Sequence, residues 1–174
     1  MMKGQKKPCS ASLTIKTSYV LPPDTNTYGT LFGGKLMAHI DGVAAIAAVR
    51  HARKPVVTAS TDSVDFLSPV KEGDAISLDA FVTWTHQTAM EGFVKVVTEE
   101  LLTGNRKVCA TAFLTLVAID EHGKPTKVPG VYPVTDEEIK LHQGGAKRAK
   151  HRQERRQHSK EMATLFGTDT PSDR

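Results

Sequence analysis

An acidic residue and a pair of glycines stand near the start of this chain in an arrangement that suits acyl-transfer chemistry. Gly33 and Gly34 open an apolar segment, and Asp41 lies within that segment. A helix that begins on two glycines presents unpaired backbone N–H groups at the positive end of its dipole, where an oxyanion or a polarised carbonyl can bind. A carboxylate in an apolar helix costs free energy if it is buried, so its presence there points to a function. We expect the glycines to stabilise negative charge and Asp41 to act as a base or nucleophile.

Each of these residues also has a structural interpretation. Asp41 could hydrogen-bond a neighbouring loop or an interface, and the glycines could allow close packing of a helix against a sheet. His39 is two residues from Asp41. Residues at that spacing point to different faces of a helix, so we expect His39 to be a polar neighbour or an interface group. We favour the catalytic interpretation of Asp41 because the glycine pair lies upstream of it.

Periodicity predicts the elements that would position these residues. Residues 34–51 are hydrophobic nearly all round, which predicts a long buried helix. Pro22-Pro23-Asp24 ends the strand pattern before this helix and opens a loop. After the helix, strand patterns recur with short turns between them, and residues 103–106 form a compact hairpin signal. The strands are expected over residues 12–21, 56–67, 75–84, 93–102 and 107–119.

This order of elements favours a two-layer α+β fold. Short consecutive connections imply antiparallel pairing, and one antiparallel sheet can curl around one apolar helix. The later sequence predicts a short helix over residues 136–142, a hinge at Gly144-Gly145 and a basic helix after it. We therefore expect a flexible N-terminus over residues 1–11, one domain over 12–135 and a C-terminal helical extension over 136–174.

Composition limits the class of protein. The 174 residues are 39% hydrophobic and 24% charged, and they include neither a run long enough to span a membrane nor a secretory signal. Cys9 and Cys109 lie far apart in the sequence. Neither a disulfide framework nor a thiolate metal site is expected from them, and we predict a cytoplasmic protein.

Three motifs carry a resemblance to a known family. They are Asn26-x-x-Gly29-x-x-Phe32-Gly33-Gly34-x-Leu36-Met37-x-x-x-Asp41, Thr58-Ala59-Ser60, and Asp65-Phe66-Leu67-x-Pro69-x-x-x-Gly73-Asp74. Together they resemble the bacterial acyl-CoA hydrolase branch of the hotdog-fold acyl-CoA thioesterases. The resemblance covers residues 12–135 and leaves the basic segment outside.

The resemblance implies hydrolysis of an acyl-CoA thioester to free acid and CoA, without a metal and with no cofactor other than CoA as part of the substrate. It implies that Gly33 and Gly34 polarise the thioester carbonyl and that Asp41 activates water or attacks directly. Asn26 would orient the water or the carbonyl, although asparagine is also a common turn residue. An alternative function is that of a non-catalytic acyl-CoA-binding hotdog protein with a sensing or regulatory role.

On the same basis, CoA is expected to contact four further residues. Its pantetheine arm would pass between the helix and the strand that carries Thr58 and Ser60. Its nucleotide would lie near Ser68 and Lys71 at the protein surface.

The distance between the glycine pair and the carboxylate predicts a dimer. Gly33 and Asp41 are separated by eight residues, which is about 12 Å along a helix. Oxyanion donors and a general base must each lie within about 3 Å of the atoms they serve. Two antiparallel helices from two chains would bring the glycines of one to Asp41 of the other. The resemblance likewise implies dimers joined edge to edge, with further assembly as a trimer of dimers.

The net charge of +4 is concentrated in the C-terminal extension. Residues 144–163 hold seven lysines and arginines against two glutamates, and the remainder of the chain is nearly neutral. This segment could be a solvated helix, or it could bind the phosphates of CoA. Binding of nucleic acid is the weakest of these three interpretations, because no aromatic residue precedes Phe166 in the segment. Neither a membrane nor a nucleic acid is an expected partner.

Overall fold

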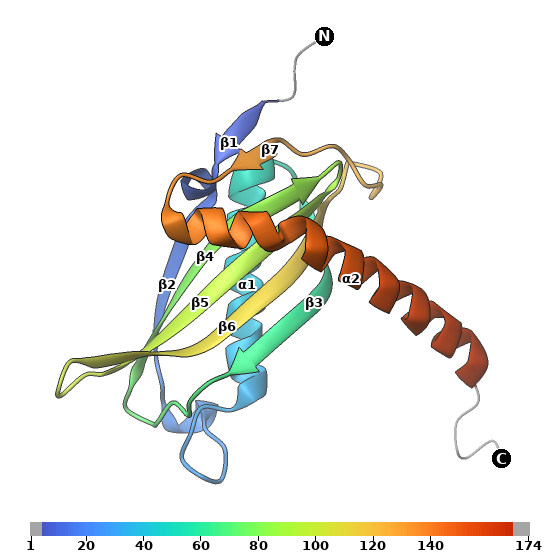
Figure 1. Cartoon of the computed structure of the whole chain (residues 1–174). Helices are drawn as coiled ribbons and strands as arrows, with labels where there is room; N and C mark the ends of the chain where they lie inside the picture. The colour runs from blue at the N-terminus through green and yellow to red at the C-terminus, as the bar shows by residue number, and fades with distance from the viewer. Residues whose placement is uncertain (1–4, 169–174) are drawn as a thin grey trace.

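A long helix lies against one face of a curved antiparallel sheet, and a second helix crosses the other face (Figure 1). The computed structural model describes residues 5–168. Helix α1 spans Gly33–Ala52, and helix α2 spans Asp136–Phe166. This arrangement confirms the predicted α+β class, with an antiparallel sheet around one central helix and a helical C-terminal segment.

The sheet has five strands in the order β2-β4-β5-β6-β3, and each neighbouring pair is antiparallel. Strands β5 and β6 form the predicted hairpin, but its turn spans residues 101–104 and not 103–106, because Asn105 and Arg106 already pair with β5. Strand β5 begins earlier than expected, because the alternating residues from Ala89 onward already pair with β4. The strands are β2 (Thr14–Tyr19), β3 (Val56–Phe66), β4 (Ala75–His86), β5 (Ala89–Glu100) and β6 (Asn105–Ala118).

The position of β3 differs from the expected series of hairpins. Strand β3 pairs with β6, with Val56 opposite Ala118, and not with the next strand along the chain. Residues 67–74 carry the chain from this edge of the sheet to β4 near the opposite edge. Local turn signals could not reveal this crossing, since they mark only where a strand stops. As a result, β3 is an edge strand that pairs on one side only within the described chain.

The N-terminal segment is ordered where flexibility was expected. Lys6–Pro8 forms β1, which pairs in parallel with β7 at Gly130–Tyr132. The 3-10 helix η1 follows at Cys9–Ser12. Cys9 is fully buried, and Lys7 donates from Nζ to the carbonyl of His51 at 2.7 Å. The prediction of a flexible N-terminus is therefore wrong for residues 6–11, and residues 1–4 lie outside the described part.

Helix α1 buries one of its faces and leaves the other open. Ala44 faces Gly92 on β5, where a Cβ atom would approach the alanine at 3.7 Å, so small residues bring helix and sheet together. On the opposite face, Met37 is 44% exposed and Ile46 is 49% exposed. The expectation of a helix buried all round is wrong for the single chain, because one sheet covers only one side. The buried face comprises Leu36, Ile40, Val43, Ala44, Ala47 and Ala48.

Helix α2 is continuous through the two glycines that were expected to form a hinge. It begins with a capping box, in which Thr135 and Glu138 bond each other's backbone N–H groups. Gly145 is buried, and a Cβ atom there would lie 2.4 Å from the ring of Trp84 on β4. The glycine therefore permits close approach of α2 to the sheet and does not serve as a hinge. In residues 5–168, neither helix is long and apolar enough to cross a membrane.

We predict that Gly145→Ala destabilises the protein. Alanine gains about 1 kcal/mol over glycine in a helix, but the clash with Trp84 should cost up to about 3 kcal/mol. A net loss of about 1–2 kcal/mol in the free energy of unfolding is expected, measured by urea denaturation. Gln143→Ala, on an exposed position of the same helix, is the control and should change stability by less than about 0.5 kcal/mol. Equal stabilities of the two variants would show that the contact with Trp84 is easily relieved.

Candidate active site

Asp41 receives a hydrogen bond from the edge strand of the sheet. Thr58 on β3 donates from Oγ1 to Oδ1 of Asp41 at 2.7 Å. Both residues are exposed, and they lie where the open face of α1 meets β3. The bond orients the carboxylate through one oxygen, and a base or nucleophile acts through the other.

The start of α1 offers backbone donors. The carbonyl of Phe32 accepts the first helical bonds, from the N–H of Lys35 at 2.9 Å and of Leu36 at 3.2 Å. The N–H groups of Gly33 and Gly34 therefore precede the first bond of the helix. A Cβ atom at Gly34 would lie 2.6 Å from the ring of Phe32, so this glycine is also required for packing. The packing role and the oxyanion role are compatible, because both require a residue without a side chain.

Asn26 organises the loop that leads into α1. Its Oδ1 accepts the backbone N–H of Tyr28 at 2.9 Å and of Thr30 at 3.2 Å, while its Nδ2 donates to Oγ1 of Thr30 at 2.9 Å. This is the turn role that asparagine often has. A side-chain amide carries two N–H donors, and the second could contact a water molecule or a carbonyl group.

The chain brings the predicted site residues together in two separate groups. Lys71 forms a bridge with Thr30, which places the loop after β3 beside the loop that carries Asn26. Asn26, Lys71 and the glycine pair thus form one group. Asp41 and Thr58 form the other, about 12 Å along the helix from Gly33. In the part of the chain that is described, no hydrogen bond connects the carboxylate of Asp41 with the side chain of Asn26.

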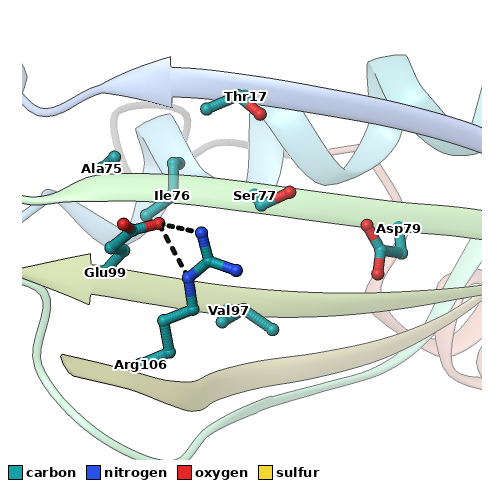
Figure 2. A pocket seen from close by; sticks show the side chains of 8 residues that line it. All are labelled: Thr17, Ala75, Ile76, Ser77, Asp79, Val97, Glu99 and Arg106. Atoms are coloured by element: carbon teal, nitrogen blue, oxygen red, sulfur yellow. Dashed lines mark hydrogen bonds and ion pairs between the residues drawn. The ribbon is translucent and has the colours of Figure 1, made fainter. Parts of the chain in front are cut away.

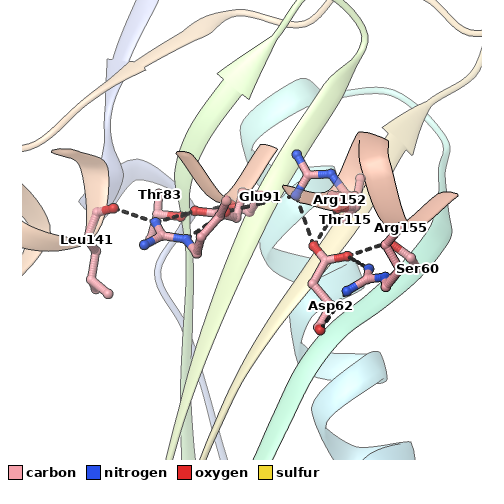
Figure 3. A network of polar contacts seen from close by, with 9 residues as sticks. Ser60, Asp62, Thr83, Glu91, Thr115, Leu141, Arg152 and Arg155 are labelled. Atoms are coloured by element: carbon pink, nitrogen blue, oxygen red, sulfur yellow. Dashed lines mark hydrogen bonds and ion pairs between the residues drawn. The ribbon is translucent and has the colours of Figure 1, made fainter. Parts of the chain in front are cut away.

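Ser60 faces away from Thr58, although both were expected on the path of CoA. Strand β3 has bulges between Thr58 and Ser60 and between Thr61 and Ser63. A bulge shifts the alternation of side chains. Thr58 points to α1, whereas Ser60 lies on the α2 side and donates to Asp62 at 2.6 Å (Figure 3).

Two further polar groups flank the site. Ser68, in the loop after β3, has a buried Oγ atom without a hydrogen-bond partner in residues 5–168. His39 contacts Nζ of Lys16 through Nδ1 at 2.8 Å. Burial, together with the charge of Lys16, lowers the pKa of His39. The described residues contain no group of three or more His, Cys, Asp or Glu placed to hold a metal ion.

Comparison with known proteins identifies the family. Residues 28–104 match the thioesterase superfamily. An uncharacterized acyl-CoA thioester hydrolase of Bacillus subtilis is 52% identical over 163 residues, which cover 94% of this chain and 95% of that protein. The chain belongs to the acyl-CoA thioester hydrolases of the thioesterase superfamily. The family identity confirms the resemblance found in the three sequence motifs.

Solved structures of thioesterases have the same fold. An acyl-CoA hydrolase from Staphylococcus aureus, in complex with butyryl-CoA, CoA and CoA disulfide, matches with a TM-score of 0.90 and 42% identity, over 94% of this chain and 99% of that one. A hexameric acyl-CoA thioesterase matches with a TM-score of 0.85 and 51% identity, over 87% and 97%. Single replacements of an asparagine, an aspartate and a threonine by alanine define three further structures of the S. aureus enzyme.

In this thioesterase, a buried ion-pair network fastens α2 to the outer face of the sheet (Figure 3). Glu91 on β5 is fully buried and receives two bonds from Arg148, at 2.9 and 2.7 Å. Thr83 on β4 donates to the same carboxylate at 2.7 Å. The guanidinium of Arg148 also lies over the ring of Phe113, 4.3 Å from its centroid. The fully buried carboxylate of Glu91 is thus compensated by several hydrogen bonds, while Arg148 keeps 29% of its side chain exposed.

Asp62 extends this network to β3. Arg152 and Arg155 bind its two carboxylate oxygens at 2.9 and 2.6 Å, and Thr115 donates to it at 2.7 Å. Burial alone would raise the pKa of Asp62. The hydrogen bonds from Ser60, Thr115 and Arg155 and the charge of Arg152 outweigh that effect and hold its pKa below the usual value.

Sequence reasoning missed this network. Interpreting the basic segment as a solvated helix is wrong for Arg148, Arg152 and Arg155, which pair with carboxylates of the sheet. Their spacing places them on one face of a helix. The matching signal was Glu91, an acidic residue that stands between Met90 and Gly92-Phe93, just before the strand expected from residue 93. No local pattern could connect the two, because the partners are 57 residues apart in sequence.

We predict that Asp62→Asn lowers the free energy of unfolding by about 2–3 kcal/mol at pH 7, because Arg152 and Arg155 lose their charged partner. The pKa of Asp62 is lower in the folded chain than in the unfolded chain. Its charge therefore stabilises the folded state above the pKa of the unfolded state, and this contribution is lost as the carboxylate is protonated. The gap between wild type and variant should therefore narrow as the pH falls below about 4. The difference in the free energy of unfolding between wild type and variant is measured by urea denaturation at a series of pH values. Asp79→Asn, whose partner Lys95 lies 3.9 Å away at the surface, should cost less than about 1 kcal/mol. A gap independent of pH would refute the ionic origin.

Proposed function

We propose that this protein hydrolyses acyl-CoA thioesters to free acid and CoA, at sites that two copies of the chain complete together. The observation that carries the proposal is the pairing of Asp41 with Thr58 on an open helix face, within a family of acyl-CoA thioester hydrolases. The glycine-opened start of α1 supplies the second half of each site. Both halves are present in every chain, but they are too far apart to act on one carbon atom.

The geometry supports a direct sequence of steps. The N–H groups at Gly33 and Gly34 of one chain bind the thioester carbonyl oxygen and stabilise the negative charge that develops on it. Asp41 of the other chain takes a proton from water, whose oxygen attacks the carbonyl carbon. Alternatively, Asp41 attacks the carbon directly and water then cleaves the anhydride. In either route the C–S bond breaks, and the departing sulfur of CoA takes up a proton. Asn26 orients the water or the carbonyl.

Two surfaces of the single chain favour association with a second copy. The open face of α1 exposes Met37 and Val49 on either side of Asp41. Beside it, strand β3 has no partner strand on its outer edge within residues 5–168. Exposed apolar area and unpaired strand edges are both features that partners cover. A two-fold axis near β3 would place the two α1 helices antiparallel and join each Asp41 to the opposite glycine pair.

The relatives add support for these assignments. The asparagine, aspartate and threonine that were replaced in the S. aureus hydrolase have the same spacing along that chain as Asn26, Asp41 and Thr58 have here. A related acyl-CoA thioesterase is hexameric. We therefore propose the dimer as the catalytic unit and a trimer of dimers as the assembly.

The remaining assignments concern CoA and the cell compartment. The pantetheine arm would pass between α1 and Thr58, with the nucleotide near Ser68 and Lys71. CoA acts as part of the substrate and product. Cys9 and Cys109 are both free thiols, which supports the reducing cytoplasm as the site of action.

We predict that Asp41→Asn reduces thiol release from acyl-CoA by roughly 10²-fold or more, because it removes the base or nucleophile while keeping the size of the side chain. Binding of CoA should persist. Thiol release can be measured on the purified protein with acyl-CoAs of several chain lengths, and binding can be measured with CoA itself. Asp79→Asn is the control and should remain active. Full activity of Asp41→Asn would end the catalytic assignment. Wild type that binds acyl-CoA but releases no thiol would favour the non-catalytic sensing role.

The composite site can be tested by mixing two inactive variants. Asn26→Ala and Asp41→Asn chains should each be inactive alone. Random pairing makes half of the dimers mixed, and each mixed dimer holds one intact site, so activity should return to about a quarter of the wild-type value. Each variant taken alone through the same exchange procedure is the control. If subunit exchange is demonstrated by mass and activity does not return, Asn26 and Asp41 do not act across the interface.

A further inference from the structure

A cleft of about 840 Å³ lies between α2 and the outer face of the sheet, on the side opposite to Asp41. Val57 and Ala59 of β3 lie in its floor, on either side of Thr58 in the sequence. Thr58 itself points through the strand toward α1. The cleft is thus separated from the proposed catalytic carboxylate by one strand of the sheet.

The helix wall of the cleft is strongly cationic. Lys150, Arg152, Arg155 and Arg156 line it, and no acidic side chain is among the lining residues. Arg152 and Arg155 are partly neutralised by Asp62. Lys150 and Arg156 have no ion pair in residues 5–168. Two uncompensated positive charges therefore face a concave surface.

The opposite wall is apolar and aromatic. Val117 and Pro125 line it together with the two floor residues. Trp84 and His86 of β4 stack with ring planes 3° apart and centroids 5.9 Å apart, and both rings line the cleft. Ser60 and Ser159 add hydroxyl groups. Such a mixture of apolar surface, flat rings and a few cations is typical of sites for small organic anions.

A second depression on the same face of the sheet makes a useful contrast (Figure 2). It measures about 270 Å³ and is lined by Asp79, Glu99 and Arg106. Arg106 binds Glu99 at 2.6 Å, so its positive charge is already compensated. Unlike the α2 cleft, this depression is therefore lined by an arginine whose charge is compensated.

We infer that the α2 cleft is a binding site for an organic phosphate with a flat ring, such as a nucleoside diphosphate group. Lys150 and Arg156 would bind the phosphates, since ammonium and guanidinium groups suit phosphate oxygens. The ring would lie against the apolar wall and the stack of Trp84 and His86. The ligand could be a free nucleotide or the nucleotide end of CoA. The latter source rests on the proposed function. It would bring Ser60 into contact with CoA and would move the nucleotide from the proposed position near Ser68 and Lys71, which do not line the cleft.

Binding can be measured without catalysis, so the test does not depend on the proposed activity. The probes are inorganic pyrophosphate, ADP and CoA, titrated calorimetrically into the full-length protein. The test variant is Lys150→Glu/Arg156→Glu. The control is Lys147→Glu/Lys160→Glu, which makes the same change of charge on the same helix outside the cleft. Circular dichroism and mass measurements establish that both variants fold and assemble as wild type does.

The cleft variant, Lys150→Glu/Arg156→Glu, should bind ADP at least about tenfold more weakly than wild type, since it loses two charge-assisted contacts. The control should stay within about twofold, because exposed charges outside the cleft are screened. His86→Ala should weaken ADP more than pyrophosphate. Equal ADP affinities of the two double variants, or no binding of ADP and CoA to wild type, would overturn the inference.

Competition distinguishes the two sources. If CoA displaces ADP and the cleft variant raises KM without changing kcat, the site holds the nucleotide end of the substrate. If ADP and CoA bind together and KM is unchanged, the site serves a separate nucleotide. If instead the cleft variant changes the mass of the assembly while the probes do not bind, a second copy of the chain fills the cleft and the inference is wrong.

Discussion

One antiparallel sheet covers only one side of a helix, and α1 is apolar on more than one side. This constraint explains why the single chain leaves Met37, Ile46 and Val49 exposed while Leu36 and Ile40 are buried. Asp41 is tolerated on an apolar helix because it lies on the open side, where Thr58 can bind it. The same constraint places the carboxylate on a surface that only a second chain could enclose. The proposed composite site follows from incomplete coverage of one helix.

Strand β3 is the element on which both faces of the protein depend. Its two bulges let Thr58 point to α1 and let Ser60 and Asp62 point to α2. An ideal strand alternates strictly, so it could not place Ser60 on the side opposite to Thr58. The arginines of α2 hold the bulged segment through Asp62. The position of β3, which carries Thr58, is therefore fixed from the outer face of the sheet, by a helix on the side opposite to Asp41.

Much of the fold could be predicted from the sequence because its signals are local. The apolar periodicity of α1, the alternation in β4 and the turn after Glu100 each depend on adjacent residues. The edge position of β3 could not be predicted, since a crossing loop and a hairpin end their strands with the same turn residues. Likewise, Gly144 and Gly145 look like a break in the helix until Trp84 is placed against Gly145.

The candidate site likewise has features that local sequence predicts and features that depend on tertiary packing. The spacing of Gly33 and Asp41 predicted two half-sites, because helix geometry fixes distances along one element. The bond between Thr58 and Asp41 depends on tertiary packing. The family motif pointed to Thr58 only as a contact of CoA, and no sequence pattern connected it with Asp41. Glu91, Asp62 and the arginines of α2 carried no motif, and their pairing depends on which helix face meets the sheet.

The burial of both cysteines has a chemical consequence for an enzyme whose product is a thiol. Exchange between a thiol and a disulfide requires a thiolate that can reach the other sulfur. Burial raises the pKa of Cys9 to about 12 and also raises that of Cys109. Neither sulfur is accessible to solvent in the folded chain. The folded chain is thus protected against mixed disulfides with the CoA it would release, whatever the balance between CoA and its disulfide around it.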